Sequence, residues 1–153
     1  MLARSPTLLW KTAGMSSSEV QTTQIDHLTP ERFVSLRRAL GVSAFGLNQI
    51  TLQPGQRGRI HRHAHQDEVY LVLGGRLMLL VEQNEELELG EGTLAHVPAH
   101  VRRQLLNPFS TPCTLVAIGA AGEHLSRDGE AFSDWSETKG KPPSEVPLPE
   151  DLP

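Results

Sequence analysis

The stretch GQRGRIHRHAHQDEVYLVLGG, residues 55–75, places three histidines and a glutamate before a run of apolar residues. Residues two apart on a strand point to the same face, so His61 and His63 can direct their imidazoles toward one point. After a bend over residues 64–67, Glu68 can bring a carboxylate to that point. Such a set suits a divalent metal ion (Fe, Mn, Ni or Zn) and leaves coordination positions open. The alternative is a solvated strand edge, because His-x-His pairs also arise by chance.

Short strands are expected on both sides of this stretch. The expected strands are Ala44–Leu52, Arg59–His63, Glu68–Leu73, Arg76–Val81, Glu86–Leu89, Thr93–Val97, Arg102–Leu106 and Thr114–Gly119. Gly74-Gly75 indicates a hairpin, and residues 83–85 indicate a second turn. Strands this closely spaced, with no helix between them, predict an antiparallel all-β domain. Several are apolar on both faces and need cover from a second sheet, a helix or another subunit, so we expect a homodimer.

One helix is expected before the strands. Thr29 is a suitable N-cap, Pro30 fits the first helical position, and Gly41 can end the helix. We interpret this segment as a helix that packs on one side of the core.

The chain divides into three parts. Residues 1–27 are an N-terminal extension, residues 28–138 hold the helix and the β domain, and residues 139–153 form a tail with five prolines. Proline fixes φ and removes a hydrogen-bond donor, so the tail is expected to be extended. Either Met1 or Met15 can be the native start.

Composition narrows the classes of function. The chain has 153 residues and a formal net charge of −4, so no overall basic field attracts nucleic acid or anionic lipid. No apolar run approaches the roughly 18 residues of a membrane span. The single cysteine, Cys113, excludes an intramolecular disulfide and suits a reducing compartment. We therefore expect a cytoplasmic protein with no nucleic-acid or membrane partner.

The spacing of the histidine-rich stretch resembles a known family. The pattern Gly55-x5-His61-x-His63-x4-Glu68-x6-Gly75 is similar to the first cupin motif at every fixed position. A weaker second match follows, in which Gly92-x5-Pro98 and Asn107 fit the second cupin motif. The resemblance implies a double-stranded β-helix, or jelly-roll barrel, with His61, His63 and Glu68 as metal ligands inside its mouth.

The second motif departs from the family where the fourth ligand, a histidine, is expected. This chain has Arg103 there, and a protonated guanidinium cannot donate a lone pair to a metal. Three outcomes are open. The other three ligands can hold the metal alone, His65 or His100 can replace the missing ligand, or Arg103 can pair with Glu68 and leave the site without metal. If metal is present, Arg103 implies an anionic ligand bridging the two cations.

Other residues near the expected site have both a functional and an ordinary interpretation. Tyr70 shares the strand parity of Glu68 and can line the cavity or pack in the core. His65 and His100 can bind the ligand or move a proton, or they can lie at an exposed rim. A local group of basic residues fits a solvated face or a small anionic molecule: Arg57, Arg59, Arg62, Arg102 and Arg103.

These residues and the resemblance together indicate a metal-binding domain that acts on or binds a small anionic molecule. One alternative is a non-enzymatic sensor or storage domain in which Arg103 replaces the fourth ligand and no metal is bound. Another is a dimerisation domain whose site has decayed. Oxygenase and isomerase activities are both common among similar proteins, and fold alone does not choose between them.

Overall fold

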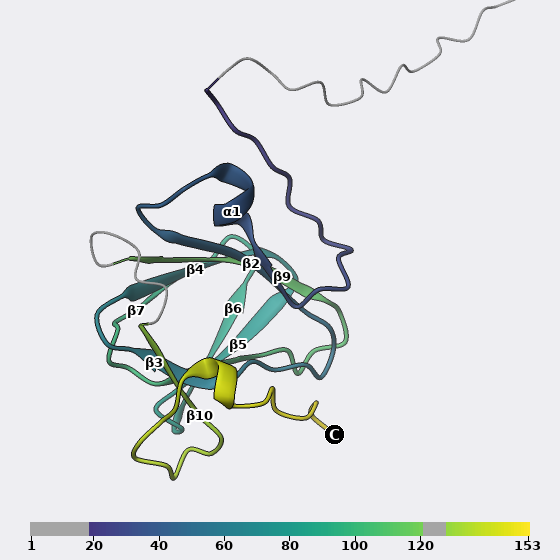
Figure 1. The fold of residues 1–153 in the computed structure, drawn as a ribbon. Coiled ribbons are helices and arrows are strands. Elements are labelled where there is room, and N and C mark those ends of the chain that lie inside the picture. Colours follow the sequence, from purple (N-terminus) through teal and green to yellow (C-terminus); the bar gives the residue numbers. More distant parts are fainter. Residues whose placement is uncertain (1–18, 121–127) are drawn as a thin grey trace, which may run out of the picture.

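The computed structural model describes residues 19–120 and 128–153, which form two antiparallel sheets, one short helix and one 3-10 turn. The first sheet has the strand order β1-β2-β9-β4-β7 and the second has the order β10-β3-β8-β5-β6. Figure 1 shows the two sheets facing each other. The elements are β1 (Phe33–Ser35), α1 (Leu36–Leu40), β2 (Gly46–Leu52), β3 (Ile60–His63), β4 (Asp67–Gly74), β5 (Arg76–Val81), β6 (Glu85–Gly90), β7 (Leu94–Val97), β8 (Arg103–Leu106), β9 (Cys113–Ala120), β10 (Gly129–Phe132) and η1 (Pro143–Glu145).

The core lies between the sheets, where alternate residues of each strand point inward. On β9, for example, Cys113, Leu115 and Ala117 are buried. The fully covered aliphatic side chains are Leu52, Val72, Leu77, Leu79 and Leu115. The expected all-β, double-stranded β-helix architecture is confirmed, but in the described residues the two sheets do not close into a barrel.

The expected strands between Ser43 and Ala120 are all present. The turn at residues 83–85 also joins two paired strands, because β5 and β6 run antiparallel from Arg76↔Gly90 to Val81↔Glu85. The hairpin expected at Gly74-Gly75 is wrong. Here β4 belongs to the first sheet and β5 to the second, so the two glycines carry the chain from one sheet to the other.

The N-terminal helix is present but shorter than expected. It begins at Leu36 and ends at Gly41, which has the left-handed φ of 65° expected of a C-cap. The preceding residues Phe33–Ser35 form β1 instead and pair with β2. Aromatic and β-branched residues favour such pairing, which here outweighs the helix start signal. Thr29 accepts a hydrogen bond from the backbone of Glu31 in a local turn.

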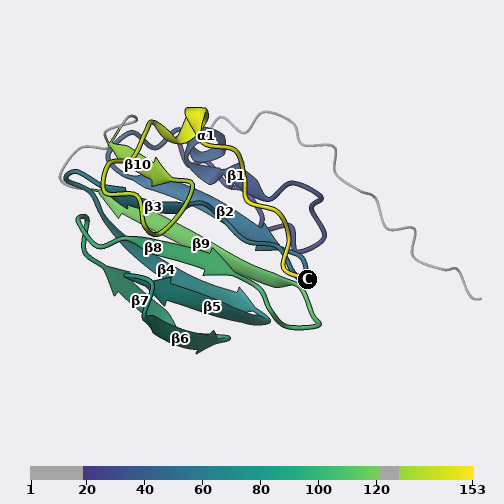
Figure 2. The ribbon, with the colours of Figure 1, turned by 90° about the horizontal axis from the view of Figure 1, so that it is seen from below.

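The C-terminal residues fold back on the domain. In Figures 1 and 2 the segment around η1 lies beside β10, and β10 in turn pairs with β3. The backbone of Val146 accepts a hydrogen bond from Arg59, and the N–H of Leu152 donates to Gly55 O at 2.8 Å. Val146 is only 2% exposed. The proline-rich tail was expected to be extended, but it includes the 3-10 turn η1, and it is held against β3 and the segment before it.

The expected N-terminal extension lies mostly outside the described residues, including both candidate start methionines. Its described part contacts the first sheet, because the side chain of Gln49 donates to Asp26 O at 2.6 Å and accepts from Asp26 N at 3.1 Å. No helix in the described ranges is long and apolar enough to cross a membrane.

Candidate metal centre

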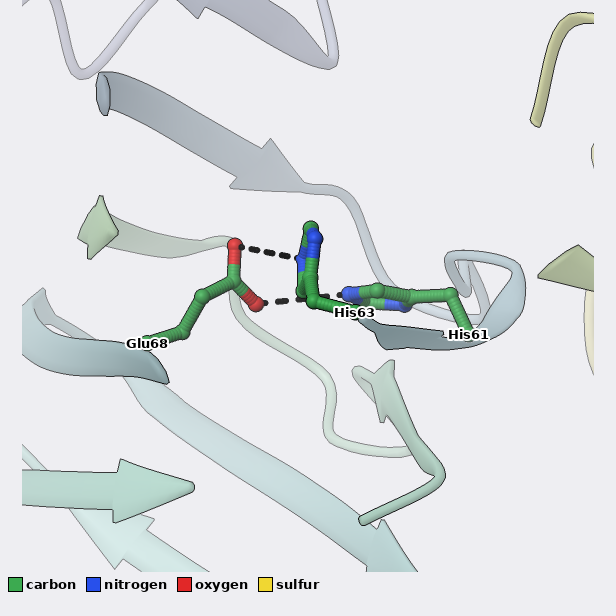
Figure 3. Close-up of side chains that lie close together, drawn as sticks. All are labelled: His61, His63 and Glu68. Atoms are coloured by element: carbon green, nitrogen blue, oxygen red, sulfur yellow. Dashed lines mark hydrogen bonds and ion pairs between the residues drawn. The ribbon is translucent and has the colours of Figure 1, made fainter. Parts of the chain in front are cut away.

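Three side chains from two facing sheets converge between the layers. His61 and His63 lie on β3 of the second sheet and point to the same side, and Glu68 lies near the start of β4 in the first sheet (Figure 3). One ligand atom from each lies within 4.8 Å of the others. We call these three residues the donor cluster. The short bend between β3 and β4 connects the two sheets here. The three side chains therefore converge, as their spacing in the sequence predicts.

The two oxygens of Glu68 have different partners. Oε2 accepts hydrogen bonds from Arg103 Nη2 at 2.7 Å and from the Tyr70 hydroxyl at 2.5 Å, and lies 3.4 Å from His61 Nε2. Oε1 lies 3.4 Å from His63 Nε2. Arg103 is fully buried, and its Nη1 donates to Ala99 O and Val101 O. Oε2 is therefore held by the protein, whereas Oε1 is available to a ligand.

This arrangement keeps Glu68 ionised. Burial alone raises the pKa of Glu68, but contacts from His61 and His63 and the charge of Arg103 hold it well below its usual value. The opposite happens at Tyr70, where burial and the Glu68 charge raise the pKa of the hydroxyl well above its usual value. Tyr70 consequently remains a hydrogen-bond donor to the carboxylate.

The donor cluster fits a cation. His61 Nδ1 lies 3.1 Å from the backbone oxygen of Arg59, an acceptor that would hold a proton on Nδ1 and leave Nε2 to a metal ion. In the part of the chain that the structure describes, neither ring nitrogen of His63 has a hydrogen-bond partner, although both are buried. Buried lone pairs facing a carboxylate are unfavourable unless a proton or a metal ion lies between them. Two imidazoles and one carboxylate are also a donor set that first-row divalent metals accept.

Asp128 supports the cluster from behind, although it is not among the site residues expected from the sequence. Its carboxylate is 2% exposed and lies 3.7 Å from His63 Nδ1. It also accepts hydrogen bonds from the backbone N–H groups of His65 and Gln66, at 3.0 and 2.8 Å. These contacts outweigh the effect of burial and lower the pKa of Asp128 to about 2. Asp128 thereby fixes the bend between β3 and β4 and stands where it can orient His63.

Two adjoining cavities, each of about 180 Å³, meet at the donor cluster. The first has mostly apolar walls, and Arg59 and Tyr70 also line it. The second is bounded by Asp128 and Gln66. The two share the following residues: Asn48, His63, Glu68, Ala117, Gly129 and Pro143. A small molecule in either cavity would touch the donor cluster, and Pro143 shows that the tail forms part of the wall.

The other expected site residues lie elsewhere or have different contacts. The side chain of His65 is 70% exposed and lies 3.0 Å from Asp128, and His100 is exposed at a turn. Neither belongs to the donor cluster. Arg103 lines neither cavity, because it lies behind Glu68. Tyr70 fits both of its interpretations, since it lines the first cavity and is 1% exposed in the core.

Comparison with known proteins agrees with the fold and the cluster. Residues 48–119 match the family model described as "Cupin domain". This part of the chain is a cupin domain. A cupin-superfamily "sugar phosphate isomerase" from Silicibacter pomeroyi is similar to it, with a TM-score of 0.59 and 25% identity over 75% of this chain and 76% of that one. A "cupin protein" from Bacteroides fragilis also shares the fold, with a TM-score of 0.59, 18% identity and coverage of 71% and 90%.

One curated relative is longer than this chain. The chain is 26% identical over 84 residues to a protein of Vibrio cholerae named "Putative mannose-1-phosphate guanylyltransferase". The match takes in 55% of this chain but spans only 18% of the relative's length. The similarity therefore concerns a small part of that protein.

Proposed function

We propose that this cupin domain binds a divalent metal ion through His61, His63 and Glu68 and uses the site to bind a small phosphorylated sugar. The observation that carries the proposal is the convergence of His61 Nε2 and His63 Nε2 on the Glu68 carboxylate, each 3.4 Å from one of its oxygens. When bound, such a metal ion would act as a Lewis acid that polarises a hydroxyl or carbonyl oxygen. The choice among Fe, Mn, Ni and Zn stays open, because all accept this donor set.

The phosphorylated sugar is suggested by two of the similar proteins. One carries the name sugar phosphate isomerase and the other is named for a sugar-phosphate reaction. The cavities are also small, at about 180 Å³ each, which suits a ligand smaller than the drug-sized molecules that fill roughly 300–1,000 Å³. Isomerisation of a sugar phosphate is accordingly the first reaction to test.

Metal analysis tests the donor cluster directly. We expect purified protein to carry stoichiometric metal and the His61→Ala/His63→Ala variant to lose it. His65→Ala is the matched control, because His65 belongs to the same run of histidines but faces solvent and Asp128. Equal metal content in the wild type and the double variant would remove the cluster as a metal site.

A second candidate is a metal-free binding domain. It is favoured by the Glu68–Arg103 pair, which already supplies the carboxylate with a cation at 2.7 Å. A bound ligand stabilises a folded protein in proportion to RT ln(1 + [L]/Kd), so thermal shifts with a panel of pentose and hexose phosphates can separate the candidates. Stabilisation that persists in a chelator supports the metal-free candidate, and stabilisation lost in a chelator supports the metal-dependent one.

The homodimer and the cytoplasmic location remain predictions. The outer face of the first sheet exposes apolar residues, among them Leu94 at 65% and Ile118 at 37%. A second copy covering this face would bury them. We expect light scattering after size-exclusion chromatography to give twice the 16.8 kDa chain mass, and a monomer at micromolar concentration would contradict the prediction.

A further inference from the structure

Arg59 lines the first cavity and forms no ion pair with any described residue. It is two residues before His61, on the same side of the chain, and it is half-buried. Its Nε donates to the backbone oxygen of Val146. Among the described residues its two Nη groups have no hydrogen-bond partner, whereas the guanidiniums of Arg62, Arg102 and Arg103 each pair with a glutamate. A guanidinium that lacks an anion beside a cavity has donors free for a ligand.

A second guanidinium stands close by. Arg32 is mostly covered, donates to Arg57 O at 3.0 Å, and reaches Asp151 only at 3.8 Å. Burial is the main cause that lowers the pKa of Arg59, and the charge of Arg32 adds to it. Two neighbouring positive charges repel unless an anion lies between or beside them. Within residues 19–120 and 128–153, the one carboxylate that contacts either guanidinium is Asp151, which is largely exposed and contacts Arg32 alone.

The position of Arg59 sets the kind of ligand. Arg59 directly precedes β3, and two extended residues span about 7 Å of backbone, which sets the scale of its separation from His61. Both residues line the first cavity, whose walls also include the apolar side chains of Ile50, Leu52 and Leu105. A low-dielectric wall strengthens an ion contact, and a guanidinium can bind a phosphate through two parallel hydrogen bonds. The cavity therefore joins a cationic end to an end that holds the donor cluster.

We propose that Arg59, with Arg32 beside it, binds the phosphate group of the ligand at one end of the cavity, while the donor cluster binds its sugar end. This assignment rests on the proposed function for the sugar, but the phosphate site itself does not require a metal. The sequence led us to expect that Arg103 contacts the anionic group of the ligand. Arg103 is instead enclosed behind Glu68, and this proposal gives that contact to Arg59.

The test measures binding of inorganic phosphate to the full chain by calorimetry, followed by a pentose phosphate and its unphosphorylated sugar. Arg59→Gln should weaken binding of phosphate and of the sugar phosphate by about 10- to 100-fold, since charge-assisted hydrogen bonds are lost. Arg59→Lys, which keeps the charge, should recover part of the affinity. Arg62→Gln is the control, because it removes the same charge from the opposite face of β3, where Arg62 pairs with Glu130.

The outcomes separate this inference from the proposed function. The metal content of Arg59→Gln should match that of the wild type. Cooperative thermal unfolding should show that the variant folds, with a melting temperature lowered only by loss of the hydrogen bond to Val146 O. If Arg59→Gln binds both phosphate probes as well as wild type does, the phosphate site is wrong even when sugar phosphates bind. If wild type binds inorganic phosphate through Arg59 but no sugar phosphate, the phosphate site stands and the proposed function fails. If wild type binds neither probe, both are wrong.

Discussion

At the scale of single residues, Glu68 connects the buried Arg103 and Tyr70 to the two histidines of the donor cluster. Arg103 and Tyr70 hold its Oε2, while Oε1 faces His63. The carboxylate therefore reaches the imidazoles already partly neutralised. This weakens its attraction for a metal ion, and it explains how the domain tolerates a buried carboxylate before any metal is bound.

Replacing Arg103 should strengthen metal binding. Arg103 pairs in register with His61 on the adjacent strand, so Arg103→His places a third imidazole beside the cluster and removes the competing cation. We expect at least a tenfold increase in metal affinity, measured by competition with a chelator. Arg102→His is the control, because Arg102 contacts Glu82 and the backbone of Trp135 instead. Unchanged or weaker metal binding in Arg103→His would contradict this account.

Asp128 should make stability depend on acid pH. Its pKa is about 2 in the folded protein, below the roughly 3.9 of an unfolded aspartate. The folded state therefore binds fewer protons, and the stabilisation is complete above about pH 4 and is lost as pH falls toward 2. Urea unfolding between pH 2 and 5 should show a shallower pH dependence in Asp128→Asn than in wild type. Parallel curves would argue against the role of Asp128.

The residues of the site differ in how readily the sequence alone predicts them. His61, His63 and Glu68 could be predicted because all three lie within eight residues and strand alternation fixes their directions. Arg59 shares that alternation, but nothing local distinguished it from a solvated arginine. Asp128 could not be found, because only the pairing of β10 with β3 brings it to the cluster.

At the scale of elements, the strands were predictable and their partners were less so. Alternating and continuous apolar runs identify strands between Ser43 and Ala120, but they do not say which sheet each strand joins. Gly74-Gly75 illustrates this limit, since a glycine pair serves equally for a hairpin and for the change of sheet observed here. The expected helix start at Thr29 is wrong for a similar reason. Residues Phe33–Ser35 form β1 because they pair with β2, and local sequence signals do not reveal that neighbour.

The change of sheet makes Gly75 intolerant of a side chain. Its φ is +74°, and a Cβ there would lie 2.2 Å from the backbone oxygen of Pro112. Gly75→Ala should therefore lower the free energy of unfolding by more than about 2 kcal/mol, measured by urea denaturation. Gly90→Ala, which meets nothing within 4 Å, should change it by less than about 1 kcal/mol. Equal effects of the two substitutions would refute the proposed constraint.

At the scale of the whole molecule, the tail is the least predictable part. Its prolines predicted an extended segment, but extension alone does not say where a segment lies. Val146 shows what holds it, because that side chain is 2% exposed and its backbone oxygen binds Arg59. Burial of one apolar residue and a few backbone hydrogen bonds attach the tail, and neither has a periodic signal in the sequence.

Val146→Asp should release the tail, because a carboxylate cannot be buried there without a partner. Amide hydrogen exchange of residues 141–152 should become at least tenfold faster, including that of Leu152, whose N–H is bonded to Gly55. Leu148→Asp is the matched control, since Leu148 is 39% exposed and the same charge is tolerated there. If both variants exchange alike, Val146 is not the anchor.

Pro143 contributes to the wall of both cavities although it follows β10, the last strand, in the chain. His61, His63 and Glu68 emerge from the ribosome well before Pro143 does. During translation, the polypeptide thus acquires the donor cluster first and completes the enclosure around it only when the segment after β10 has emerged.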